Sequence, residues 1–497
     1  MIEWSPELML LLTMLVPAGA VFGIVGTGRY PNLRETLTIS ASLVLIYLVS
    51  ALYQITKSGV VVQVTSPELF AGLAIDFRIE PLGMLFSLVA GYLWLITTVY
   101  SIGYMRGHDE KNQTRFYTCF AVAISSVMGI AYADNLFTLF IFYEILTLST
   151  YPLVTHSGTE KAKKGGRVYL GVLLTTSIMF LLMAMIGTWY VTGTLDFRAG
   201  GIFDQSTASA AAILLPLFIF GIGKAAIMPF HRWLPSAMVA PTPVSALLHA
   251  VAVVKAGVFS VLKICVYIFG LDLLKTLPTT DMLLYLSGAT VVLASLVAMR
   301  QDNLKARLAY STVSQLGYIT IGALLATGAG ALGGAMHIAM HAFGKITLFF
   351  CAGAIMVASH KTEISQMRGL GYKMPVTMTA FLIGSLSIIG LPPTGGTWSK
   401  WYLMIGAIDT EKWILMMILM LSSLLNIAYL LPIPVRAFWV DHEGDDHSGA
   451  AIKEAPLPAL LALSVTAIGC IVLFFYTQPL YELAAAFLEA AGIPYGR

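Results

Sequence analysis

Long runs of apolar residues alternate along the chain with short polar segments. A membrane-spanning helix needs about 20 mostly apolar residues, because the hydrocarbon core of a bilayer is about 30 Å thick. The pattern predicts an all-α polytopic membrane protein with about fourteen transmembrane helices. The predicted spans cover residues 7–26, 37–56, 82–104, 116–132, 134–155, 167–190, 210–229, 243–269, 282–300, 308–327, 330–358, 375–405, 412–434 and 456–477.

Two shorter segments have other patterns. Residues 57–80 alternate apolar and polar side chains, as at Val60, Val62 and Val64, which is typical of strands with one buried face. We therefore expect an extra-membrane hairpin there. The segment 481–488 is expected to form a short helix at the membrane interface.

The seventh predicted span contains a proline near its end. Pro229 has no N–H to donate to the carbonyl oxygen of Ala225, which is the residue after Lys224. We therefore expect a broken helix with a free carbonyl group beside this lysine. Irregular backbone at membrane depth is tolerated only where it is buried in protein or lines a wet cavity.

The twelfth predicted span is interrupted in the same way. Pro392 and Pro393 leave the carbonyl groups of Ile388 and Ile389 without helical partners, a short distance before Lys400. Each broken span thus carries one lysine near its break.

The two broken spans are five helices apart, and paired broken segments in two halves of a chain are a sequence pointer to a transport site. Spans 4–8 and 9–13 are therefore expected to form two five-helix repeats, the second inverted because five is odd. Four regions follow: 1–115 with helices 1–3 and the hairpin, 116–270 with the first repeat, 271–434 with the second repeat, and 435–497 with a loop, helix 14 and the C-terminal tail.

The composition agrees with a membrane protein. Apolar residues make up 58% of the 497 residues and charged residues 11%, whereas a soluble domain carries roughly 25% charged residues. The mean hydropathy is +0.81. These values exclude a soluble globular protein, a disordered chain and a nucleic-acid binder. The four cysteines, Cys119, Cys265, Cys351 and Cys470, have no CxxC spacing, so we expect no metal centre and no disulfide framework.

Lysine and arginine are unevenly divided between the two predicted faces. The odd-numbered loops, starting with the one between spans one and two, hold eighteen basic residues, and these include the cluster Lys161 to Arg167. The other face holds six, namely Lys57, Arg78, Arg198, Lys275, Lys412 and Arg497. Because basic residues accumulate in cytoplasmic loops, we expect both termini outside the cytoplasm, with the protein in a cytoplasmic membrane of the prokaryotic type.

Six ionisable residues lie inside the apolar segments: Lys224, Lys255, Lys263, Lys345, Lys400 and Glu144. A charge at the centre of a spanning helix costs about 2.5–3.5 kcal/mol, so some gain must offset it. One structural alternative is that a lysine near a span end reaches interfacial water, which we favour for Lys263. Another is a static ion pair that only fixes packing. Five lysines and one glutamate leave most lysines without a carboxylate, and such lysines can release and rebind a proton.

Histidines extend this row of ionisable groups. His337, His341 and Lys345 are at positions i, i+4 and i+8 of span eleven, so they line one helix face within about 80°. His249 precedes Lys255 on span eight but does not share its face. Hydrogen-bonded packing is the alternative for the two span-eleven histidines. No carboxylate or cysteine accompanies their HxxxH spacing, so a metal site is not expected.

At these residues, and over nearly its whole length, the chain resembles the antiporter-like membrane subunits shared by respiratory complex I, membrane-bound hydrogenases and Mrp-type multisubunit cation/proton antiporters. The most specific pieces are Lys224 with residues 228–235, then 240–249, 302–317, 337–345 and 390–400.

The resemblance implies roles for the buried groups. Glu144 is similar to the family's essential glutamate on span five, paired with Lys224 on span seven. Lys255 resembles the central relay lysine and Lys400 the terminal group. The histidines that would link them through buried water are His249, His337 and His341. Lys345 is included in this relay without a separate role.

The departures from the family pattern inform the subtype. The middle subunit of complex I typically has glutamate where this chain has Lys400, and some members have histidine in place of Gln315. With the segment 399–403, these features are most similar to the D-type subunit of Mrp antiporters. They leave open the corresponding subunit of complex I or of a hydrogenase-like complex.

The leading functional hypothesis is therefore a proton-translocating subunit of an Mrp-type Na⁺/H⁺ antiporter, acting in the lipid bilayer with other membrane subunits. The alternative is the homologous proton-pumping subunit of complex I or a membrane-bound hydrogenase-like complex. A chain without flavin, quinone or cluster motifs is expected to need no cofactor, and we expect its cargo to be H⁺, together with Na⁺. An independent carrier of an organic solute fits less well, because the polar residues are spread over spans 5, 7, 8, 11 and 12 rather than gathered in one pocket.

Overall fold

The computed structural model describes residues 4–69, 73–439 and 452–493. In these residues the regular secondary structure is helical, apart from one pair of short strands. Its first half contains the helices α1 (Pro6–Gly26), α2 (Pro31–Lys57), α3 (Pro81–Gly107), α4 (Gln113–Tyr132), α5 (Leu136–Val154), α6 (Glu160–Thr176), α7 (Leu182–Thr192), α8 (Ala208–Gly221), α9 (Trp233–Ser236), α10 (Thr242–Ala246), α11 (Val253–Ile264) and α12 (Leu271–Thr276). Its second half contains α13 (Pro278–Arg300), α14 (Leu304–Leu324), α15 (Gly328–Ser359), α16 (Leu370–Lys373), α17 (Pro375–Ile389), α18 (Gly396–Asp409), α19 (Trp413–Leu430), α20 (Pro432–Trp439), α21 (Leu457–Phe475) and α22 (Gln478–Ala490).

Eleven helical segments in the described part of the chain are long and apolar enough to cross a membrane. The three other predicted spans also coincide with helices, but these helices are too short or too polar to be counted as candidate spans. The seventh and twelfth are interrupted, and their apolar helices, Gln205–Gly221 and Pro375–Ile389, are shorter. The tenth is α14, an unbroken helix with buried polar side chains such as Gln315. The chain is thus a multi-pass membrane protein with about eleven candidate spans and broken helices.

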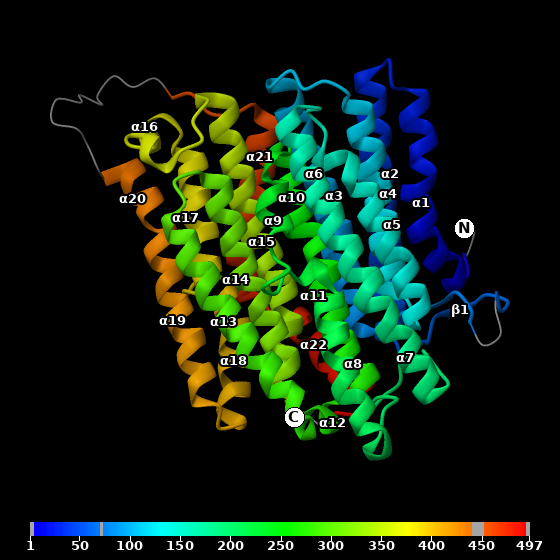
Figure 1. Cartoon of the computed structure of the whole chain (residues 1–497). Helices are drawn as coiled ribbons and strands as arrows, with labels where there is room; N and C mark the ends of the chain where they lie inside the picture. Colours follow the sequence, from blue (N-terminus) through cyan, green and yellow to red (C-terminus); the bar gives the residue numbers. More distant parts are fainter. Residues whose placement is uncertain (1–3, 70–72, 440–451, 494–497) are drawn as a thin grey trace.

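The helices form one bundle with the most buried elements in its middle (Figure 1). Helices α1, α2 and α4–α7 lie on one side, and α13, α17, α19 and α20 lie on the other (Figure 1). Between them are α11 and α15. Every residue in the apolar window of the segment Thr242–Phe269 is buried, as are 78% of those in the window of α15. Ionisable side chains on these two helices are therefore shielded from lipid by protein.

Both predicted helix breaks are present, although the first begins earlier than expected. Helix α8 ends at Gly221, before Pro229, and Lys224 lies in the 3₁₀ turn η3 (Gly223–Ala225). The carbonyl oxygen of Gly223 in this turn receives a hydrogen bond from Trp233 Nε1 at 2.9 Å. The break therefore surrounds the lysine rather than following it.

The second break separates α17 from α18. Helix α17 ends at Ile389, and Gly390 follows in a left-handed conformation with φ +88°. A side chain there would be strained, and its Cβ would lie 2.7 Å from Lys400 Cδ. Glycine at this position therefore lets the lysine of α18 fold back over the end of α17.

The region predicted as a hairpin contains strands β1 (Gln63–Thr65) and β2 (Asp76–Arg78), which pair antiparallel with Val64 opposite Phe77. The predicted C-terminal helix is present as α22, which contacts α3 and α15, and its buried Phe487 packs against Tyr267. Arg497, one of the residues counted in the charge comparison, lies outside the described residues, as do parts of the predicted hairpin and of region 435–497.

Candidate functional site

Lys224 is completely buried in its 3₁₀ turn, and helix α5 supplies its hydrogen-bond acceptors. The ammonium group donates to the carbonyl oxygen of Tyr143 at 2.8 Å and to the hydroxyl of Thr147 at 2.6 Å. It also lies over the ring of Tyr143. The Tyr143 hydroxyl accepts a hydrogen bond from the main-chain N–H of Lys224 at 3.2 Å. Two elements that are far apart in sequence are thereby joined at the lysine.

Glu144 is adjacent to these acceptors but is not one of them. Its side chain is half-buried, and neither carboxylate oxygen has a hydrogen-bond partner among the described residues. No ion pair within 4.0 Å joins it to Lys224, since the lysine is occupied by Tyr143 and Thr147. Lys224 thus binds the turn of α5 that carries Glu144, but the two expected partners form no ion pair.

Lys255 lies on α11, which passes very close to the turn that holds Lys224. A Cβ atom on Gly257 would lie only 2.4 Å from the carbonyl carbon of Lys224, so no larger residue fits without a shift. On its other side, Lys255 Nζ lies 2.5 Å from Nδ1 of His341 on α15. The lysine therefore connects the first half of the bundle with the second.

His337 and His341 lie on the same face of α15, as expected from their spacing. Their ring centroids are 5.8 Å apart. His337 Nδ1 lies 2.8 Å from the hydroxyl of Ser399, and its Nε2 lies 3.1 Å from Oε1 of Gln315. The row that begins at Lys255 thus reaches α18, one residue before Lys400.

Lys400 is buried in the space left by the second helix break. Its ammonium group donates to the carbonyl oxygen of Ile389 at 2.9 Å and to the hydroxyl of Ser423 at 3.2 Å. It also lies 4.7 Å from the ring centroid of Tyr318, a residue that stacks against His337. One of the two carbonyl groups that the sequence predicts to be free is therefore used by this lysine.

Lys345 is completely buried one helical turn beyond His341. It donates to the carbonyl oxygen of Leu308 at 3.3 Å and to the hydroxyl of Ser311 at 2.6 Å. Ser311 accepts a hydrogen bond from the Tyr429 hydroxyl at 2.9 Å. Lys345 therefore has neutral oxygen acceptors, as Lys224 and Lys400 do.

His249 is a predicted relay residue whose ring nitrogens have no hydrogen-bond partner among the described residues. It lies in the π-helical segment η5 (Leu247–Val251), which precedes α11, and it is completely buried. Its ring packs 4.6 Å from the ring centroid of Phe349. An unpaired buried imidazole is costly, so this position favours a buried water as the partner of the ring.

The expectation that Lys263 reaches interfacial water is wrong. Its side chain is completely buried, with its ammonium group 3.0 Å from Oε2 of Glu80 and 2.6 Å from the carbonyl oxygen of Ala133. Glu80 is not recognisable as a partner from the sequence, because it stands at the end of the predicted hairpin, directly before α3. The other polar partners without a sequence signal are ordinary hydroxyl residues on apolar helices, namely Thr147, Ser311, Ser423 and Tyr429.

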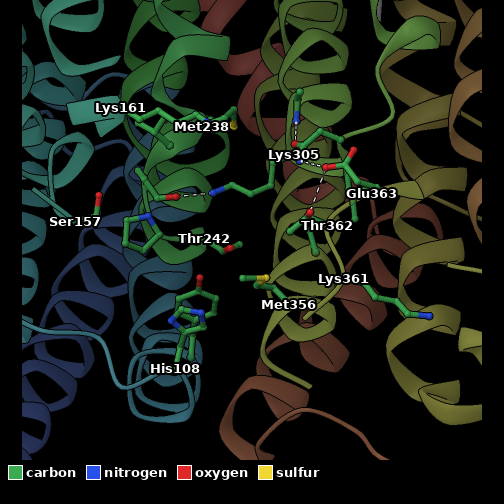
Figure 2. A pocket seen from close by; sticks show the side chains of 18 of the residues that line it. His108, Ser157, Lys161, Met238, Thr242, Lys305, Met356, Lys361, Thr362 and Glu363 are labelled. Carbon is green, nitrogen blue, oxygen red and sulfur yellow. Dashed lines mark hydrogen bonds between the residues drawn. The ribbon is translucent and has the colours of Figure 1, made fainter. Parts of the chain in front are cut away.

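A cavity of about 730 Å³ lies between loops that carry basic residues of the predicted cytoplasmic face. His108, Lys161, Lys305, Lys361 and Glu363 line it, and Lys305 donates a hydrogen bond to the carbonyl oxygen of Ala240 (Figure 2). The cavity also borders the start of α10, the helix that continues into the segment with His249. In the part of the chain that the structure describes, no group of three or more His, Cys, Asp or Glu residues is arranged to hold a metal ion.

Residues 133–426 match the model of the transmembrane NADH:quinone oxidoreductase/Mrp antiporter family. The chain belongs to this family. It is thus an antiporter-like membrane subunit, as its resemblance implied. All the relay residues named above lie within the matched segment.

Curated relatives in the family include NADH-quinone oxidoreductase subunit N of Desulforudis audaxviator, which is 31% identical over 81% of this chain and 82% of its own length. NAD(P)H-quinone oxidoreductase chain 5 of Synechocystis is 34% identical over 66% of this chain. The chain spans about half (49%) of that longer relative.

Solved structures share the fold of this family member. A chain of the Mrp complex from Dietzia sp. DQ12-45-1b superposes with a TM-score of 0.86 at 22% identity, covering 99% of this chain and 98% of its own. A chain of the membrane-bound sulfane sulfur reductase, an archaeal respiratory membrane complex, superposes with a TM-score of 0.85 at 23% identity, covering 97% and 98%. These relatives are parts of multisubunit membrane complexes.

Proposed function

We propose that this protein is the proton-translocating subunit of an Mrp-type multisubunit Na⁺/H⁺ antiporter, similar to the D-type subunit of such complexes. The observation that carries the proposal is the buried row from Lys255 through His341 and His337 to Ser399 and Lys400, with successive groups in contact or adjacent in the chain. Each member can accept or donate a proton or a hydrogen bond. The row crosses the middle of the bundle between the two broken helices.

The first half of the relay would control the second electrostatically. A charge change within about 4–6 Å alters the free energy of proton binding by roughly 1.4–4 kcal/mol. Lys224 is free to exchange its neutral acceptors for the carboxylate of Glu144, which has no hydrogen-bond partner among the described residues. That movement would alternately strengthen and weaken proton binding at Lys255, which lies on the helix packed against Lys224.

The proposal includes the wider organisation expected from the sequence. It places fourteen spans in the membrane, with spans 4–8 and 9–13 as inverted repeats and with regions 1–115, 116–270, 271–434 and 435–497 as units. Both termini lie outside the cytoplasm of a prokaryotic-type cell, and other membrane subunits complete the antiporter. The full coverage of the Mrp-complex chain and the two breaks, each with its lysine, support this arrangement.

The second candidate is the homologous proton-pumping subunit of complex I or of a membrane-bound hydrogenase-like complex. The names of the curated relatives, NADH-quinone oxidoreductase subunit N and NAD(P)H-quinone oxidoreductase chain 5, favour it. Affinity purification of the tagged chain from its native membrane separates the two. Small membrane subunits alone support the antiporter, and hydrophilic redox subunits support the second candidate.

The relay itself is tested with Glu144→Ala in a strain that depends on this system for growth in sodium. Loss of sodium resistance and of proton exchange in everted vesicles is expected, at unchanged levels of assembled complex. Full retention of both activities would contradict the proposed role of the first half.

A further inference from the structure

A second group of buried charges lies at the end of the bundle opposite the basic loops. Its centre is the pair of Lys263 on α11 and Glu80, the residue before α3, with Nζ and Oε2 3.0 Å apart. The Lys263 ammonium group also donates a hydrogen bond to the carbonyl oxygen of Ala133, at 2.6 Å. The ring of Phe197 covers the Lys263 ammonium group, with its centroid 4.4 Å from Nζ.

The carboxyl group of this pair opens into a cavity. Glu80 lines a space of about 380 Å³ between the start of α3, the segment after α2, and α22. Arg78, Lys57 and Glu482 line the same space, and the last two form an exposed ion pair at 3.2 Å. Glu80 therefore lies at the boundary between the buried pair and this surface cavity.

Asp134 gives the pair a second ionisable neighbour. It lies between α4 and α5, and Gln63 of β1 donates a hydrogen bond to its Oδ2 at 3.1 Å. Burial raises its pKa to about 6, a shift that Glu80 reinforces and Lys263 opposes. This carboxyl group therefore binds a proton more tightly than an isolated aspartate does.

The pair is in line with the relay on the same helix. Lys255 and Lys263 are eight residues apart on α11, so they lie about 12 Å apart along the axis and within about 80° of the same face. Phe259 stands between them on that face, and its ring lies 5.0 Å from the ring of Phe86 on α3. Two aromatic rings thus separate the relay from the charged pair.

We propose that Lys263 and Glu80 form a proton exit from the first half of the relay, which the Phe259–Phe86 ring pair closes at rest. This inference rests on the proposed function of the relay and adds an outlet to it. When the rings separate, the Lys263 ammonium group gives a proton to the Glu80 carboxylate, which releases it into water of the 380 Å³ cavity, and the neutral Lys263 amine then takes the proton that leaves Lys255. Each transfer breaks one N–H or O–H bond and forms another, so Lys263 and Glu80 return to their starting states, and the relay supplies Lys255 with its next proton.

The test uses the whole purified complex in liposomes that contain a pH-sensitive dye. Glu80→Gln keeps the size of the side chain, but the amide can neither accept nor release a proton. We therefore expect transport to be at least about tenfold slower at equal assembly. Glu35→Gln is the matched control, because Glu35 is also a buried carboxylate in an ion pair, with Arg106, but lies outside the proposed exit. It is expected to transport protons at the wild-type rate.

A second measurement separates proton transfer from a purely structural pair. Formate added to the outside is expected to restore transport in Glu80→Ala, because a small acid in the cavity can take the place of the missing carboxyl group. It is not expected to restore Lys255→Ala. In Phe259→Ala, a passive proton leak is expected, and adding Glu80→Gln is expected to suppress that leak.

The outcomes are distinct. Wild-type transport in Glu80→Gln, or a loss of transport in Glu80→Ala that formate does not restore, would overturn the exit and leave the pair a structural role. Normal transport in Lys255→Ala would instead overturn the relay and the proposed function with it.

Discussion

The ammonium group of Lys400 donates a hydrogen bond to the carbonyl oxygen of Ile389, 2.9 Å away. In an unbroken helix this oxygen would accept the N–H of residue 393, which is a proline and has none. The helix break therefore provides Lys400 with a neutral acceptor at membrane depth. A lysine held in this way is positioned without a carboxylate that would fix its charge.

Lys400→Met is expected to slow proton transport by about tenfold or more, because it removes the last ionisable group of the row. It also leaves the Ile389 carbonyl without its partner, a loss of about 1–3 kcal/mol of stability. Dye quenching in everted vesicles measures transport, and thermal unfolding of the complex measures stability. Lys412→Met, which removes a lysine paired with Asp281 at the surface, should change neither. Unchanged transport in Lys400→Met would remove it from the relay.

The hydroxyl of Thr147 gives a test of how Lys224 is held. Thr147→Val removes the acceptor 2.6 Å from Lys224 Nζ but keeps the shape, whereas Thr147→Ser keeps the acceptor. A hydrogen bond to a charged group contributes about 1.5–3 kcal/mol, so we expect roughly tenfold slower exchange in the valine variant and nearly normal exchange in the serine variant. Equal rates in both variants would mean that the lysine does not use this acceptor during transport.

His337 and His341 are expected to act as one unit, because protons that reach one must pass the other. Each single change to glutamine should therefore slow transport strongly, and the double variant should be little slower than either single variant. Initial rates for the four proteins form a double-mutant cycle. Effects that simply multiply would show that the two histidines lie on separate routes.

Much of this architecture follows from the sequence, because lipid imposes simple rules on it. Apolar runs of the required length predict the helices, and Pro229 and Pro393 predict the two breaks. The spacing of His337 and His341 predicts their common face. The first break begins earlier than Pro229 because Trp233 and the close approach of Gly257 stabilise a non-helical turn around Lys224. Such long-range contacts leave no local signal.

The partners of the buried charges could not be predicted for the same reason. Glu144 and Lys224 are close in the bundle, but Tyr143 and Thr147 compete for the lysine, and this depends on the position of each atom. Glu80 stands before a helix and outside any apolar run, so nothing in its neighbourhood indicates a buried pair with Lys263. Hydroxyl residues on apolar helices are common and become informative only when their neighbours are known.

Gly257 is expected to be essential for assembly. Its missing side chain allows α11 to lie against the Lys224 turn, where a Cβ atom would be 2.4 Å from a carbonyl carbon. Gly257→Val is therefore expected to destabilise the protein by about 1–3 kcal/mol or more, as overpacking does. Gly171→Ala is the control, since nothing lies within 4 Å of the added Cβ. The yield of assembled complex and its thermal unfolding are measured for both variants. A normal yield of Gly257→Val would show that the contact between α11 and the Lys224 turn can adapt to a side chain.

The burial of His156 is expected to make the folded protein less stable in acid. It lies just after α5 and is only 3% exposed, near Arg115 and with Nε2 4.0 Å from Glu110. Burial, reinforced by Arg115, lowers its pKa, so the folded protein binds this proton less readily than the unfolded chain does. Its contribution is therefore fully present above about pH 6.5 and is lost as the pH falls through the lowered folded-state pKa. The melting temperature of the wild type should fall more between about pH 7.5 and about pH 5.5 than that of His156→Gln. His360→Asn, which changes an exposed histidine, should keep the pH dependence of the wild-type melting temperature. If the melting temperature of His156→Gln falls as steeply as that of the wild type, the acid sensitivity belongs to another group.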